Sequence, residues 1–60
     1  MKKYIYYSDN EALTEILNER FEMVCNEDMD IIITCDKGEL EAYVAEVAPA
    51  AEGDYSLEEI

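Results

Sequence analysis

Carboxylates are the side chains of this chain whose number and spacing could do chemistry. The sequence holds 16 Asp and Glu against four Lys and Arg, for a formal net charge of -12 at pH 7. One group recurs at i, i+4, i+8 and i+11, the spacing of one helix face, and comprises Glu11, Glu15, Glu19 and Glu22. A second group lies in and around the stretch CDKGELEAY and comprises Asp30, Asp36, Glu39 and Glu41. Carboxylates so arranged could catalyse acid–base reactions, hold a cation, or present negative charge to a partner.

The first two of these uses find no support in the sequence. The chain has no His, so it lacks the commonest general base and the usual partner of a Ser or Cys nucleophile. Two Cys without His do not make a zinc site, and no Gly-rich loop precedes a helix. Asn26, Asp28 and Asp30 alternate as in a calcium loop, but Ile31 and Lys37 stand where an EF-hand needs Gly and Glu. We therefore expect no enzyme, no metal and no cofactor.

The charge balance favours a basic partner. Phosphates and anionic lipids are themselves negative, so direct contact with nucleic acid or a membrane surface is disfavoured. No apolar run approaches the length that spans a membrane, and we expect a cytoplasmic protein. Cys25 and Cys35 should then be reduced thiols that behave as small apolar side chains.

The first half of the chain predicts a strand followed by a helix. Residues 2–8, KKYIYYS, are aromatic and β-branched and favour a strand. Ser8 and Glu11 fit a capping box, and apolar residues at helical spacing predict a helix over residues 10–24. Arg20 falls within the apolar stripe with no carboxylate three or four residues away. It should extend to the edge of the core or pair with an acid elsewhere in the fold.

The second half predicts a β-hairpin. Residues 30–36 and 39–47 alternate as strands, with Lys37 and Gly38 as a two-residue turn. In that register Asp36 lies opposite Glu39, and like charges facing each other across a strand pair are destabilising. A partner that supplies positive charge would account for this arrangement.

The predicted fold class is α+β, a small two-layer β-α-β-β domain. One helix packs on a three-stranded mixed sheet, in which strands one and two run parallel through a right-handed crossover and strand three completes the hairpin. Residues 1–47 form the domain, and residues 48–60 form a linker and short acidic tail that could dock on it. The predicted core consists of Ile5, Tyr7, Leu13, Ile16, Leu17, Phe21, Val24, Ile31, Ile33, Cys35, Leu40, Ala42 and Val44.

The outer sheet face of this domain is centred on tyrosine. Ile32 pairs there with Tyr43, and Tyr4 and Tyr6 should join them inside a ring of acids. Aromatic anchors within a charged rim resemble a protein interface. Contact with another protein, a homodimer and cover by the tail are all compatible with this face.

The acidic rows have a spacing comparable to that of nucleic-acid phosphates. Glu residues four apart on a helix rise about 6 Å, similar to the gap between successive phosphates on one strand. An acidic helix and an acidic hairpin can therefore offer a phosphate-like row to a basic groove and exclude nucleic acid from it.

With its size, charge and the acidic runs NEALTEILNERFE and CDKGELE, the chain resembles small phage-encoded anti-CRISPR and antirestriction inhibitors. Several of these act as nucleic-acid mimics. The resemblance implies a protein that binds a CRISPR effector, such as a multi-subunit Cascade, and blocks its target DNA. The residues expected at the partner are the eight acids of the two groups and Tyr43.

Two other interpretations stay open. The chain could be an acidic interaction module, an antitoxin or small subunit, that uses the Tyr-centred face. An acid-rich protein of a salt-loving cell is disfavoured, because Lys outnumbers Arg and Ile is abundant.

Overall fold

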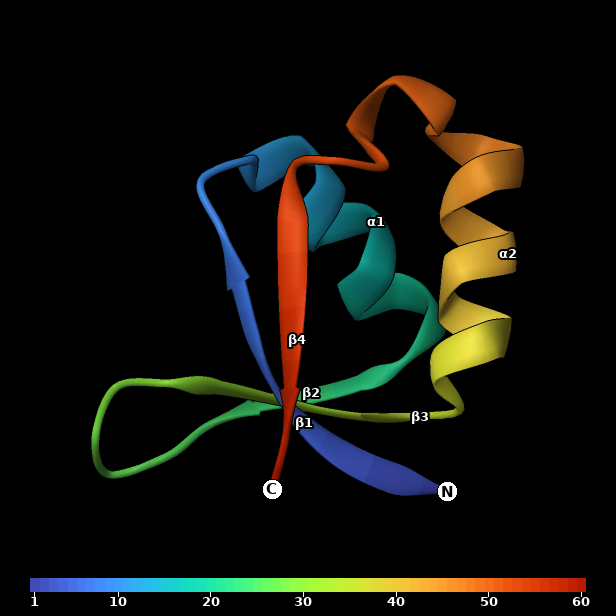
Figure 1. The fold of residues 1–60 in the computed structure, drawn as a ribbon. Coiled ribbons are helices and arrows are strands. Elements are labelled where there is room, and N and C mark those ends of the chain that lie inside the picture. The colour runs from blue at the N-terminus through green and yellow to red at the C-terminus, as the bar shows by residue number, and fades with distance from the viewer.

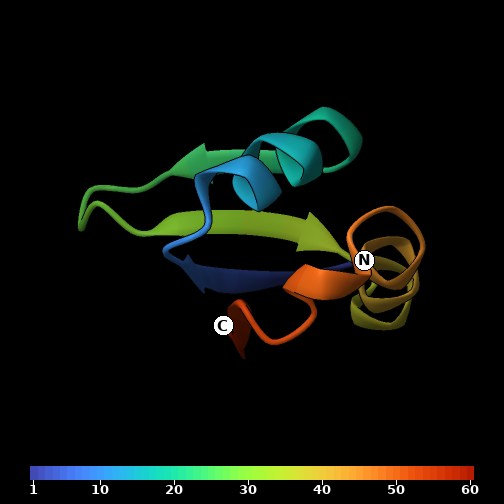
Figure 2. The same cartoon turned by 90° about the horizontal axis from the view of Figure 1, so that it is seen from above.

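Four strands and two helices alternate in the order β-α-β-β-α-β in the computed structural model, which describes residues 1–60. The elements are β1 (Lys2–Ser8), α1 (Glu11–Arg20), β2 (Glu22–Cys25), β3 (Ile31–Cys35), α2 (Lys37–Val47), the short 3-10 turn η1 (Pro49–Ala51) and β4 (Tyr55–Glu59). The strands form one antiparallel sheet in the order β2-β3-β1-β4. This is the split β-α-β topology of ferredoxin-like domains. Both helices lie on the same side of the sheet (Figures 1 and 2).

The α+β class is confirmed, but the three-stranded mixed sheet is wrong. β1 pairs antiparallel with β3, with Tyr4 opposite Ile33, where a parallel pair was expected. The reason is the additional strand β2 between α1 and β3. β2 runs in the direction of β1, and the turn at residues 26–30 then reverses the chain into β3.

The predicted hairpin is also wrong, because residues 37–47 form helix α2. The Asp36 carboxylate caps this helix and accepts hydrogen bonds from the backbone N–H groups of Gly38, at 2.9 Å, and Glu39, at 3.4 Å. Leu40 and Val44, one helical turn apart, are both fully buried. Glu39 lies in the first turn, where the helix dipole favours a carboxylate. Asp36 and Glu39 therefore do not oppose each other across a strand pair.

Helix α1 is shorter than predicted and has a different cap. Its N-cap is Asn10, whose side-chain oxygen accepts the Leu13 N–H at 3.0 Å, and Ser8 instead accepts the Asn10 N–H. At the other end the Phe21 N–H donates a hydrogen bond to the Leu17 carbonyl, and the backbone becomes extended at Phe21. Residues 22–25 then pair with β3 as a sheet edge, so their partner strand overrides the helical spacing.

The C-terminal segment belongs to the sheet. Residues 55–59, expected as part of an acidic tail, pair with β1 as strand β4, with Leu57 opposite Tyr6. In the expected linker, residues 49–51 form the 3-10 turn, and Ala51 is buried. The folded unit thus extends past residue 47.

The core lies between the helices and the sheet and contains nine buried residues. They are Tyr4, Tyr6, Leu13, Leu17, Ile33, Cys35, Leu40, Val44 and Ala51. Six of these were predicted, but β1 turns the opposite face inward, so Tyr4 and Tyr6 replace Ile5 and Tyr7. Burial of Tyr6 is possible because its hydroxyl bonds Thr14 Oγ1 at 3.0 Å. Of the other predicted core residues, Ile16, Phe21 and Ile31 are half-buried, while Val24 and Ala42 are exposed.

The Asp36 cap gives a direct test of helix α2. Asp36→Ala should lower the free energy of unfolding by about 1 kcal/mol, because two backbone donors lose their acceptor. Urea denaturation measures this change. Glu46→Ala, which removes one exposed carboxylate from the same helix without breaking a cap, is the matched control. Equal stability of the two variants would contradict the cap.

Candidate acidic interaction surface

Few of the carboxylates are neutralised within the fold. The two ion pairs join Lys2 to Glu59, at 3.4 Å, and Arg20 to Glu39, at 2.7 Å. No buried residue is polar or charged, and every acid except the half-buried Asp30 is exposed. The two ion pairs therefore leave most of the negative charge of the surface without an internal partner.

Three of the four acids in the first group form a row on helix α1. Glu11, Glu15 and Glu19 are exposed, lie at i, i+4 and i+8, and take part in no ion pair. The helix contains no Lys, and Arg20 at its end is bound to Glu39. We call these three residues the α1 row. Glu22 falls outside it, because β2 places Glu22 opposite Thr34 on the sheet face turned away from the helices.

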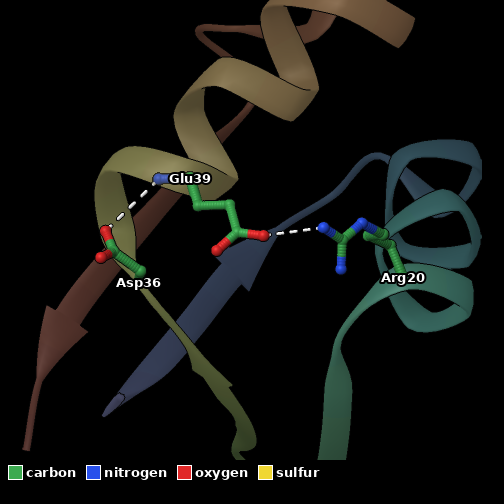
Figure 3. A network of polar contacts seen from close by, with 3 residues as sticks. All are labelled: Arg20, Asp36 and Glu39. Carbon is green, nitrogen blue, oxygen red and sulfur yellow. Dashed lines mark hydrogen bonds and ion pairs between the residues drawn. The ribbon is translucent and has the colours of Figure 1, made fainter.

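Three residues of the expected hairpin site make contacts within the fold: Asp36, Glu39 and Tyr43. The Arg20 guanidinium contacts Glu39 and lies 5.1 Å from the centre of the Phe21 ring and 5.8 Å from that of Tyr43. The two rings meet edge to face with centres 5.8 Å apart. Figure 3 shows Arg20 reaching from the end of α1 to Glu39, beside the Asp36 cap. Of the two alternatives predicted for Arg20, extension to the edge of the core and pairing with an acid elsewhere in the fold, the structure shows the pair, with Glu39.

Glu41 lies in a different place, a groove of about 430 Å³ between α2 and β4. Glu52, Tyr55 and Lys37 line the same groove. Burial raises the pKa of the Tyr55 hydroxyl above its ordinary value, and the carboxylates of Glu41 and Glu52 raise it further. The eight acids and Tyr43 expected at the partner are thus spread over α1, the α1–α2 junction, this groove and the sheet.

The expected Tyr-centred sheet face is wrong in composition. Tyr4 and Tyr6 are buried under the helices and Tyr43 lies on α2, so only Ile32 stays on the outer face. Ile5, Tyr7 and Val24 accompany it there, and Asp30 lies close enough to affect the Tyr7 hydroxyl. Strand 2–8 is apolar on both faces, so its alternation could not identify which side faces the helices.

Several further features bear on the chemistry of the surface. No three His, Cys, Asp or Glu side chains come together as a group that could hold a metal ion. Cys25 is an exposed and Cys35 a buried free thiol. Neither helix is long and apolar enough to cross a membrane.

Comparison of this chain with protein-family models, with curated proteins and with solved structures found no match.

Stability should fall at alkaline pH. Burial raises the pKa of the Cys35 thiol above its ordinary 9.0, as do the carboxylates of Asp36 and Glu39, and burial also raises that of Tyr55 above 10.0. The folded chain holds these protons more tightly than the unfolded chain. The stabilisation is therefore complete below about pH 9 and is lost as pH rises through the folded pKa values. Urea midpoints should decrease above about pH 9, and less so in Cys35→Ala. An unchanged wild-type midpoint at about pH 10 would contradict this.

Stability should also rise with salt. Unpaired carboxylates repel one another, and the screening length shortens from about 10 Å at 0.1 M salt to about 3 Å at 1 M. The melting temperature should increase by several degrees over this range of NaCl. The variant E11Q/E15Q/E19Q, which removes the charges of the α1 row, should show a smaller rise. A flat or falling melting temperature would exclude strong self-repulsion.

Proposed function

We propose that this protein is a non-enzymatic inhibitor that binds a basic nucleic-acid-binding surface of another protein and excludes the nucleic acid. The observation that carries the proposal is the α1 row, three exposed carboxylates on one helix face without an internal cation. A solvated helix face ordinarily mixes Lys with Glu, because opposite charges four residues apart stabilise the helix and like charges destabilise it.

The spacing of the α1 row suits a groove built for phosphates. Residues four apart on a helix are separated by about 6 Å along its axis. Lysine and arginine side chains that bind successive phosphates could therefore meet successive carboxylates. The net charge of -12 would also accelerate the encounter with a basic surface.

The resemblance to anti-CRISPR inhibitors supplies the class of target. We propose a CRISPR effector of the Cascade type, encountered in the host cytoplasm, whose DNA-binding groove the chain occupies. Glu22, Asp30 and Glu41 stay candidate contacts, although they lie outside the α1 row, Glu22 on the sheet face and Glu41 in the groove between α2 and β4. Asp36 and Glu39 are less suitable as contacts, because a cap and an ion pair already engage them.

The contact should therefore be tested on α1 and not on the predicted hairpin. Replacing Glu39 by Lys would break the pair with Arg20 and disturb the junction of the two helices, so loss of inhibition could not be assigned to the partner. Glu to Gln changes at residues 11, 15 and 19 keep side-chain size and helix propensity while they remove three charges.

Wild-type protein should prevent a purified, guide-loaded Cascade complex from binding its target DNA in a gel-shift assay. E11Q/E15Q/E19Q should need at least about tenfold more protein for the same effect. E27Q/D28N/E46Q is the matched control, because it removes three exposed charges from the turn and from α2. Equal inhibition by the two variants would show that the row has no special role, and no inhibition by wild type would exclude this target.

The alternative function is an acidic interaction module, such as an antitoxin or small subunit. The apolar sheet face that no helix covers favours it. Salt distinguishes the two functions, because screening weakens a phosphate mimic far more than an apolar contact.

A further inference from the structure

A row of aliphatic side chains crosses the sheet on the face opposite the helices. Val24 of β2 pairs with Ile32 of β3, which pairs with Ile5 of β1, which pairs with Glu58 of β4. Tyr7 lies two residues along β1 on the same face. We call Ile5, Tyr7, Val24 and Ile32 the uncovered face.

Neither helix covers these side chains, of which Val24 and Tyr7 are exposed and Ile5 and Ile32 are half-buried. Both helices pack on the other side of the sheet, and the C-terminal segment extends the sheet as its edge strand (Figures 1 and 2). Val24 is 54% and Tyr7 44% exposed. An antiparallel sheet with one solvated face ordinarily places polar residues there. A contiguous apolar row in this position is typical of a binding surface.

Acids surround the uncovered face. Glu22 lies on the same side of β2 as Val24, and Glu58 ends the aliphatic row. The Tyr7 hydroxyl donates a hydrogen bond to Glu58 at 3.2 Å, and Asp30 lies nearby. Lys3, opposite Thr34, is the single cation of this face. An apolar centre within a charged rim is the arrangement of protein interfaces.

The negative charge of the rim determines which kind of partner can bind the uncovered face. A second copy would bring carboxylates against carboxylates and a charge of -12 against -12, and like charges across an interface are costly. Anionic lipid meets the same repulsion. A protein surface with an apolar centre flanked by Lys or Arg complements both the row and its rim.

The edge strand β2 connects this face to the α1 row. A groove of about 260 Å³ runs between α1 and β2, with Met23 and Ile31 among its apolar walls. Glu15 of the α1 row and Val24 of the uncovered face both line it. One partner that follows the β2 edge can therefore contact the helix row and the sheet face together.

We propose that the uncovered face is a second docking surface, on which the basic partner seats an apolar contact around the β2 edge. This inference rests on the proposed function, because it assigns the face to the same partner. The carboxylates attract the partner over a distance, and the apolar contact slows its release.

The test uses a matched pair of exposed valines. Val24→Thr alters the uncovered face and keeps a β-branched residue in the strand. Val47→Thr makes the same change at the end of α2, where the side chain is 45% exposed. Ile32→Thr probes the centre of the row. Binding of each variant and of E11Q/E15Q/E19Q to immobilised, guide-loaded Cascade is measured at about 0.1 M and about 0.5 M NaCl. Thermal melting verifies that each variant is folded.

Val24→Thr and Ile32→Thr should each raise the dissociation constant about tenfold, mainly through faster release. Their salt dependence should match the wild type, whereas E11Q/E15Q/E19Q should show a weaker salt dependence and Val47→Thr should change nothing. Wild-type affinity in both face variants, with loss in the α1 variant, would overturn the second surface and leave the proposed function intact. Loss in the face variants alone would support the surface and overturn the mimic. A wild-type chain that does not bind overturns both.

Discussion

Every carboxylate of this chain has to stay in water, and this constraint governs the rest of the fold. Nine buried residues form the core, none of them polar or charged, while 16 acids share the surface of a 60-residue chain. A domain of this size gains limited stability from its core, so a single unpaired buried carboxylate would be a severe cost. One layer of two helices on one sheet meets the constraint, because it provides a core and leaves each acid at an edge, a turn or an outer face.

The acids divide into those that the fold uses and those that it leaves free. Asp36 caps α2, Asp54 accepts a hydrogen bond from Asn10 at 3.1 Å, and Glu58 accepts one from Tyr7. Glu39 and Glu59 hold the two ion pairs. The chain has too few hydrogen bonds and cations to pair with the remaining acids. A solubility role would tolerate scattered Lys among these acids, so the absence of Lys from the row on α1 favours the basic partner that we propose.

Local signals made part of the fold predictable, and long-range pairing decided the rest. The strand at residues 2–8 and most of the first helix follow from side chains close in sequence. Residues 39–47 alternate like a strand, yet Leu40, Tyr43, Val44 and Val47 also have helical spacing, and Asp36 three residues before Glu39 is a cap signal that settles the ambiguity. Strand β2 has no such signal, because four residues at an edge become a strand only by pairing with β3.

The same distinction separates the two parts of the candidate site. The acids of the α1 row lie on a single helix, as the sequence predicts. The hairpin site required a strand register that the structure does not contain, because residues 37–47 form a helix. The uncovered face depends on which side of β1 the helices select, so it emerges only with the whole sheet. Negative charge by itself attracts any basic protein, because Coulomb attraction is long-ranged and tolerant of geometry. An apolar row of fixed shape must fit its counterpart closely, so under the proposed function the sheet face, more than the acids, would determine which basic partner is bound.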